Sequence, residues 1–146
     1  MSDNLKKCRE TLKSGEYTLV LFDGKTLFTD KERGVKPLLD LLDKNTDLSG
    51  FSAADKVVGK AAAFLYVLLN VREIYADVIS THALAVLERH KIPVEYNTLT
   101  EKIKNRAGTG FCPMETAVLG EDEPENALKK IREKAKELSK NNKTAS

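Results

Sequence analysis

The chain has 146 residues, of which 41% are hydrophobic and 32% are charged, the composition of a single soluble globular domain. Its formal net charge of +2 is too close to neutral to indicate nucleic acid or a membrane surface as partner. An uncharged apolar run of about 18 residues is absent, so no spanning helix is expected, and the first residues predict no secretory signal. The two cysteines lie far apart in the sequence, which favours free thiols and a cytoplasmic protein.

The first part of the chain predicts a helix, a β-hairpin and a second helix. Residues 4–14 carry apolar side chains at helical spacing. Residues 17–23 and 25–29 predict two strands, because Asp23-Gly24 between them is typical of a two-residue hairpin turn. Residues 34–44 predict a short amphipathic helix with a proline in its first turn.

The most apolar stretch, residues 51–70, reads FSAADKVVGKAAAFLYVLLN. We interpret it as one buried helix, because a helix that is hydrophobic on all sides belongs inside a domain. Ser52 is then the N-cap, and Asp55 three residues later completes a capping box. Lys56 and Lys60 are expected on one face of this helix, together with the glycine between them.

The remaining chain predicts an alternation of strands and helices. We expect a strand at 72–79, a helix at 81–90 and a short strand at 92–96. The short strand contains Pro93, so it is expected near a sheet edge. The elements that follow are a helical turn at 99–104, a glycine loop at 106–111, a helical turn from 112 and an exposed helix at 125–139. Residues 140–146 are expected to be a disordered tail, which leaves one domain over residues 1–139.

This order of elements predicts an α/β fold. Two strands joined by a helix are expected to be parallel with a right-handed crossover, whereas the hairpin strands are antiparallel. The result is a mixed sheet of about four strands with helices on both faces, a three-layer α/β/α domain.

Two stretches and one serine carry a resemblance to a known family. The segment SAADKVVGKAAAFL, the strand-end Ser80 and the segment NRAGTGFCPMET at 105–116 resemble the DUF1893 family, a set of small prokaryotic proteins assigned to the cytidine-deaminase-like superfamily. The resemblance covers about residues 4–138 and implies a cytidine-deaminase-like fold.

The resemblance does not bring deaminase chemistry with it. Zinc deaminases carry H-x-E or C-x-E at one helix start and P-C-x-x-C at a second. The corresponding starts here read Ala54-Asp55-Lys56-Val57 and Ser80-Thr81-His82-Ala83, and neither is a zinc triad. We therefore expect no metal, no cofactor and no established reaction.

The first candidate site comprises Asp55, Lys56, Gly59 and Lys60. Amides at a helix amino terminus together with two ammonium groups suit a phosphate or carboxylate. Gly59 would let a ligand or another backbone approach closely. In the alternative interpretation Asp55 only caps the helix and both lysines extend to solvent.

The second candidate site lies in the 105–116 segment. Cys112 precedes a proline-initiated turn, where a thiolate is stabilised, so it is a candidate nucleophile with Glu115 or Asp55 as the base. It could equally be a small buried residue, with Glu115 reaching back to cap its amide. Asn105 and Arg106 precede the glycine loop; Arg106 either clamps a phosphate or pairs with a surface carboxylate.

Ser80, the two histidines and Cys8 are further residues with possible roles. Ser80 either lines the pocket or only caps the following helix. His82, His90 and Cys112 are too few, at incompatible spacing, to form a zinc site. Cys8 lies on the apolar face of the first helix and is expected to be part of the core.

Three functions follow from these residues. The first is a zinc-free deaminase-like domain that binds a small phosphorylated or nucleotide-like ligand near Lys56, Lys60 and Cys112. The second is a cysteine-dependent transferase or hydrolase that uses Cys112. The third is a non-catalytic regulatory or interaction protein. The sequence leaves open whether the chain is an enzyme, and a homodimer is a further candidate assembly.

Overall fold

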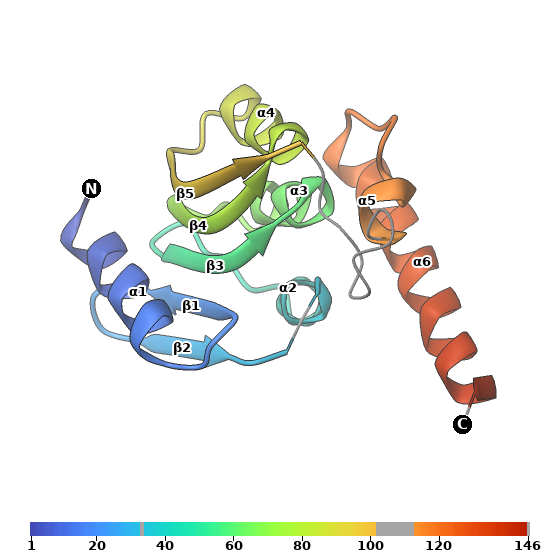
Figure 1. The fold of residues 1–146 in the computed structure, drawn as a ribbon, viewed down its shortest axis with the longest axis horizontal. Helices are drawn as coiled ribbons and strands as arrows, with labels where there is room; N and C mark the ends of the chain where they lie inside the picture. The colour runs from blue at the N-terminus through green and yellow to red at the C-terminus, as the bar shows by residue number, and fades with distance from the viewer. Residues whose placement is uncertain (33, 102–112, 146) are drawn as a thin grey trace.

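A computed structural model of the chain describes residues 1–32, 34–101 and 113–145, with side chains described up to residue 138. Five strands form one mixed sheet in the order β2-β1-β3-β4-β5 (Figure 1). In chain order the elements are α1 (Asp3–Ser14), β1 (Leu19–Phe22), β2 (Leu27–Asp30), α2 (Lys36–Asp43), β3 (Ser52–Val58), α3 (Lys60–Leu68), β4 (Glu73–Ser80), α4 (Thr81–Arg89), β5 (Val94–Thr100), α5 (Pro113–Ala117) and α6 (Pro124–Ala145).

The predicted hairpin and the predicted parallel crossover are both confirmed. Strands β1 and β2 are antiparallel, and the carboxylate of Asp23 accepts hydrogen bonds from the amides of Lys25 and Thr26 in the turn between them. Strands β3, β4 and β5 are parallel neighbours. Because β1 also pairs antiparallel with β3, the hairpin and the parallel strands form a single sheet of the α/β class.

The interpretation of residues 51–70 as one helix is wrong. Residues Ser52–Val58 form β3, and only Lys60–Leu68 form a helix, with Gly59 as its N-cap. β3 is the central strand of five, and its buried residues, Ser52, Ala53, Ala54 and Val58, do not alternate with exposed ones. Such a short run cannot be distinguished from a buried helix by periodicity alone. The sheet consequently has five strands rather than about four.

The strand predicted at 92–96 is longer than expected. β5 runs from Val94 to Thr100, so it includes the first two residues of the turn expected at 99–104. It forms a sheet edge, as Pro93 indicated. At the other end of the chain, α6 extends to Ala145, into the stretch from residue 140 for which we expected no structure. The expected domain limit at residue 139 stays a prediction.

Helices pack on both faces of the sheet. On one face α1 places Leu5, Cys8 and Leu12 against strand residues that include Val20 and Tyr75. The other face carries the larger core, to which α2, α3, α4 and α6 contribute. Helix α3 lies between α4 and α6 and buries all seven residues from Lys60 to Tyr66 (Figure 1). The amino end of α3 is therefore the most enclosed helix start in the described part of the chain.

Candidate functional site

Lys56 and Lys60 lie on either side of the end of β3. Lys56 is exposed on the strand, and its backbone amide pairs with the carbonyl of Thr18. Lys60 is the first residue of α3 and is only 7% exposed. The helix face that these two lysines were predicted to share does not exist, because a strand end and Gly59 separate them.

The amino end of α3 already holds a carboxylate from the chain itself. Glu115 of α5 is 5% exposed, and its Oε2 accepts a hydrogen bond from the amide of Lys60 at 2.5 Å. A methyl group on Gly59 would lie 2.8 Å from the Glu115 carboxyl carbon. Gly59 has a φ of −94°, so it is required for space rather than for backbone conformation. The group that approaches Gly59 closely is the side chain of Glu115, which caps α3, and the approach of a ligand or another backbone stays a prediction.

The buried ammonium of Lys60 also has partners within the protein. Its Nζ donates a hydrogen bond to the carbonyl of Leu119 at 2.8 Å and lies 5.7 Å from the centre of the Phe64 ring. A buried charge requires such partners, because removal from water is costly. Lys60 thus connects α3 to α5 through its backbone amide and to the turn after α5 through its side chain.

Asp55 forms a pair with Tyr66 between β3 and α3. The hydroxyl of the fully buried Tyr66 donates to Asp55 Oδ2 at 2.7 Å, and the amide of Val57 donates to Oδ1 at 3.2 Å. Burial raises the pKa of Asp55 from 3.8 to about 6, although both hydrogen bonds oppose the rise. Burial and the neighbouring Asp55 carboxylate raise the pKa of Tyr66 well above its usual value. Asp55 is therefore not the helix cap that the sequence predicted.

A cavity of about 200 Å³ lies between α3 and α4, and we call it the α3/α4 groove. Its lining residues are Lys60, Phe64, His82, Ala85, Val86, Arg89, His90 and Asp122. Four of the eight are basic, one is acidic, and the other three form an apolar wall. Lys60 is the one lining residue that the sequence analysis selected as a ligand-binding residue.

Two lining residues of this groove have polar atoms without a protein partner among the described residues. His90 Nε2 is buried and has no hydrogen-bond partner in the described part of the chain. Arg89 is exposed, and no described residue forms an ion pair with it. Buried polar atoms are normally hydrogen-bonded, so the orphaned nitrogen indicates that a water or a ligand completes this site.

Arg89 and Asp122 were missed by the sequence analysis. Arg89 follows His82 and Val86 on α4 at intervals of four and three residues, the spacing of one helix face. That spacing was the available signal, but the two histidines were considered only as metal ligands. Asp122 lies in the turn before α6, and its place beside α4 depends on long-range packing.

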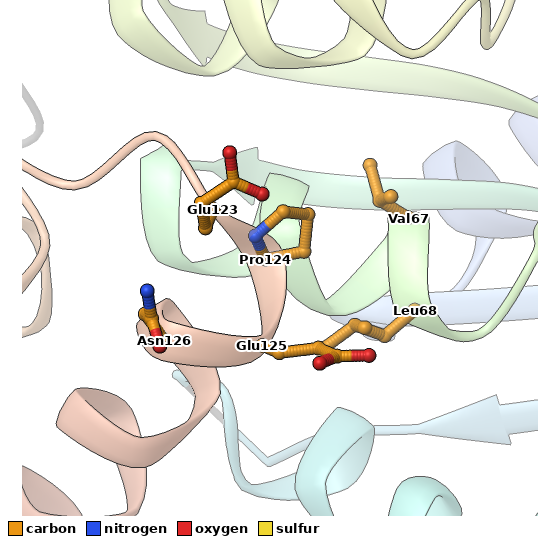
Figure 2. A pocket seen from close by; sticks show the side chains of 6 residues that line it. All are labelled: Val67, Leu68, Glu123, Pro124, Glu125 and Asn126. Atoms are coloured by element: carbon orange, nitrogen blue, oxygen red, sulfur yellow. The ribbon is translucent and has the colours of Figure 1, made fainter.

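A second cavity, of about 400 Å³, lies between the end of α3 and the start of α6. Figure 2 shows its lining: Val67 and Leu68 come from α3, Glu123 comes from the turn before α6, and α6 itself contributes Pro124, Glu125 and Asn126. This lining holds two carboxylates and no basic side chain, so it does not suit an anion. It contains none of the residues predicted from the sequence.

Ser80 and Cys8 have structural roles. Ser80 is fully buried, and its hydroxyl accepts a hydrogen bond from the amide of Ala83, which confirms its role as the N-cap of α4. Cys8 is fully buried, and its thiol donates to the carbonyl of Ser52. Burial raises the pKa of Cys8 to about 12, so it is a core residue as predicted.

Cys112, Asn105 and Arg106 lie outside the described residues. Their place relative to the groove, and the reactivity of Cys112, stay predictions. Within the described ranges, no group of three or more His, Cys, Asp or Glu side chains is arranged to hold a metal ion. In the same ranges, no helix is both long and apolar enough to cross a membrane.

Comparisons with known proteins identify a family and a similar solved structure of that family. The family described as "TM1506: Domain of unknown function (DUF1893)" matches residues 7–135. The crystal structure of a DUF1893 family protein from Thermotoga maritima is similar to this chain with a TM-score of 0.81 and 29% sequence identity. The similarity covers 90% of this chain and 88% of that one. No curated protein matches the sequence.

Proposed function

Because the chain belongs to the DUF1893 family, whose description assigns no function, we propose a function from the chemistry of the α3/α4 groove. The groove binds the anionic group of a small phosphorylated or nucleotide-like ligand. This proposal retains the predicted ligand class and the predicted role of Lys60. It moves the partners of Lys60 from the preceding strand to helix α4.

The observation that carries the proposal is the basic lining around an unsatisfied nitrogen. Arg89, His82 and His90 face the same cavity as Lys60, and His90 Nε2 has no partner in the described chain. A guanidinium binds phosphate oxygens through two parallel hydrogen bonds, and an imidazole can donate a third. The apolar wall and the carboxylate of Asp122 would contact an organic part and a hydroxyl of the ligand.

The size of the groove limits how much of a ligand it encloses. Pockets for complete small molecules typically measure roughly 300–1,000 Å³. At about 200 Å³ the groove suits a phosphate or carboxylate with a small adjoining group. The remainder of a nucleotide would extend beyond Arg89 and His82, which are exposed.

The cytidine-deaminase-like assignment is part of the same proposal. It is supported by the order of a hairpin, a helix, a strand and a second helix on a mixed sheet. In the observed fold these helices are α2 and α3, so the starts to compare with zinc motifs are Val35-Lys36 and Gly59-Lys60. Neither contains a zinc ligand or a catalytic glutamate. We therefore propose ligand binding without the zinc-dependent deaminase reaction.

The catalytic alternative stays a prediction. Cys112, its nucleophile, lies outside the described residues. Its two candidate bases are already engaged, because Asp55 accepts from Tyr66 and Glu115 accepts from the amide of Lys60.

A cytoplasmic location, a prokaryotic source and the absence of membrane and nucleic-acid partners also stay predictions.

Isothermal titration calorimetry tests the proposal with inorganic phosphate, adenosine monophosphate and adenosine. We expect the two phosphate-bearing probes to bind and the neutral nucleoside to bind far more weakly. Arg89→Gln should weaken phosphate binding about tenfold, because a hydrogen bond to a charged group contributes roughly 1.5–3 kcal/mol and this one is exposed.

Arg9→Gln is the matched control for this experiment. Arg9 lies on α1, on the opposite face of the sheet, where its guanidinium is 6.0 Å from the Tyr75 ring. The control removes the same charge without touching the groove and should leave phosphate binding unchanged. Equal binding of adenosine and its monophosphate, or equal losses in the two arginine variants, would refute the proposal.

A further inference from the structure

Strand β5 forms one outer edge of the sheet (Figure 1). Among the described elements it packs against β4 and α4, while all side chains from residue 95 to residue 99 stay exposed. Two of these are large and apolar, since Tyr96 is 42% exposed and Leu99 is 43% exposed. An edge strand also presents backbone donors and acceptors that a further strand can pair with.

Within the described residues, β5 has few of the features that usually protect a sheet edge, and Glu95 is its one charged side chain. It contains no lysine or proline, and its register with β4 keeps one offset from Val94 to Thr100, so no bulge interrupts it. The opposite edge is protected, because β2 has only four residues and Lys31 follows it directly. The two edges of this sheet are thus built differently, and only β5 is suited to accept another strand.

We propose that β5 pairs in antiparallel orientation with β5 of a second copy, forming a homodimer with one continuous sheet. A second copy fits because the strand is complementary to itself about a two-fold axis at Asn97. In that register Tyr96 lies opposite the partner's Thr98, an aromatic and β-branched pair of the kind that stabilises sheets.

The charges of the strand also fit this pairing. Glu95 is the single charged residue of β5, and it lies opposite the partner's Leu99 rather than opposite a second carboxylate. The amino group of Met1 lies 3.9 Å from Glu95 Oε1 and partly offsets the field of this carboxylate. The two-fold arrangement therefore brings no like charges face to face.

Sedimentation equilibrium of the full-length protein tests the dimer. We expect a concentration-dependent equilibrium between monomer and dimer. Because each substitution acts twice in a two-fold interface, Leu99→Lys should raise the dissociation constant about tenfold or more. Leu27→Lys is the matched control: Leu27 is a 47% exposed leucine on β2, the other edge, and the substitution should leave the dissociation constant unchanged.

A cysteine at the two-fold axis provides an independent readout that does not need a disrupted interface. Asn97→Cys in a Cys112→Ser background should form a disulfide-linked dimer on mild oxidation, because directly opposed residues in an antiparallel pair have Cα atoms about 4.5–5.5 Å apart. Cys8 is buried and does not compete. A monomer at all concentrations overturns the proposal. A dimer that uses another face also overturns it. Leu99→Lys would not weaken such a dimer, and a cysteine at position 97 would not cross-link it.

Discussion

At the scale of single residues, the carboxyl of Asp55 is the most informative group. Its pKa of about 6 in the folded protein lies above the ordinary value of 3.8 because the carboxyl is buried against Tyr66. The folded state therefore holds this proton at pH values where the unfolded state has released it. The free energy of unfolding should fall as the pH rises from about 4 to about 6, and then stay level with respect to this group.

Asp55→Asn should remove this pH dependence while keeping an acceptor for the Tyr66 hydroxyl. We expect the variant and the parent protein to have similar stability below about pH 4, where the carboxyl is protonated in both states. Above about pH 7 the variant should be more stable by about 2 kcal/mol, since one pKa unit corresponds to 1.36 kcal/mol and partial exposure reduces the effect. Urea denaturation across this range measures the difference. A difference that is the same at every pH would contradict the assignment.

At the scale of elements, the contact between α5 and the start of α3 holds the C-terminal part of the domain in place. The carboxylate of Glu115 fills the space above Gly59 and accepts from the amide of Lys60. A carboxylate at this position satisfies an orphan amide and is favoured by the helix dipole. The Glu115 carboxylate fills the space that a side chain at position 59 would occupy. Substitutions at Gly59 and Glu115 should therefore be energetically coupled.

A double-mutant cycle with Gly59→Ala and Glu115→Ala measures that coupling. Gly59→Ala alone should destabilise the protein by about 1–2 kcal/mol, because the new methyl group displaces the carboxylate. In the Glu115→Ala background the same change should cost less, which gives a coupling energy of about 1 kcal/mol. Gly50→Ala is the control, since a methyl group there would meet no described atom within 4 Å beyond its chain neighbours. Additive effects of the two changes would show that the contact contributes no coupling.

Most elements could be predicted from local sequence, and the central one could not. The hairpin follows from Asp23-Gly24, and α4 follows from the cap at Ser80. The prediction of a helix over β3 was wrong because the strand pairs with β1 and β4, which no local window contains. Gly59 marks the boundary between the strand and the helix, but the sequence analysis interpreted it as a site of close approach within a single helix.

At the scale of the whole molecule, the candidate site assembles from three separated segments. Lys60 comes from α3, the two histidines and Arg89 come from α4, and Asp122 comes from the turn before α6. Sequence reasoning reached Lys60, because a lysine within so apolar a stretch requires a partner. It could not reach Arg89 or Asp122, because the groove exists only once α4 packs against α3.

The central claim is that the α3/α4 groove holds an anion, and nuclear magnetic resonance of the imidazole nitrogens tests it most directly. The chain has only two histidines, and both line the groove. During titration with inorganic phosphate at constant pH, the nitrogen resonances of His82 and His90 should shift along one saturating curve. Arg89→Gln should weaken that curve, and Arg9→Gln should not. Resonances of His90 that stay fixed at phosphate concentrations that saturate the calorimetric signal would contradict the claim.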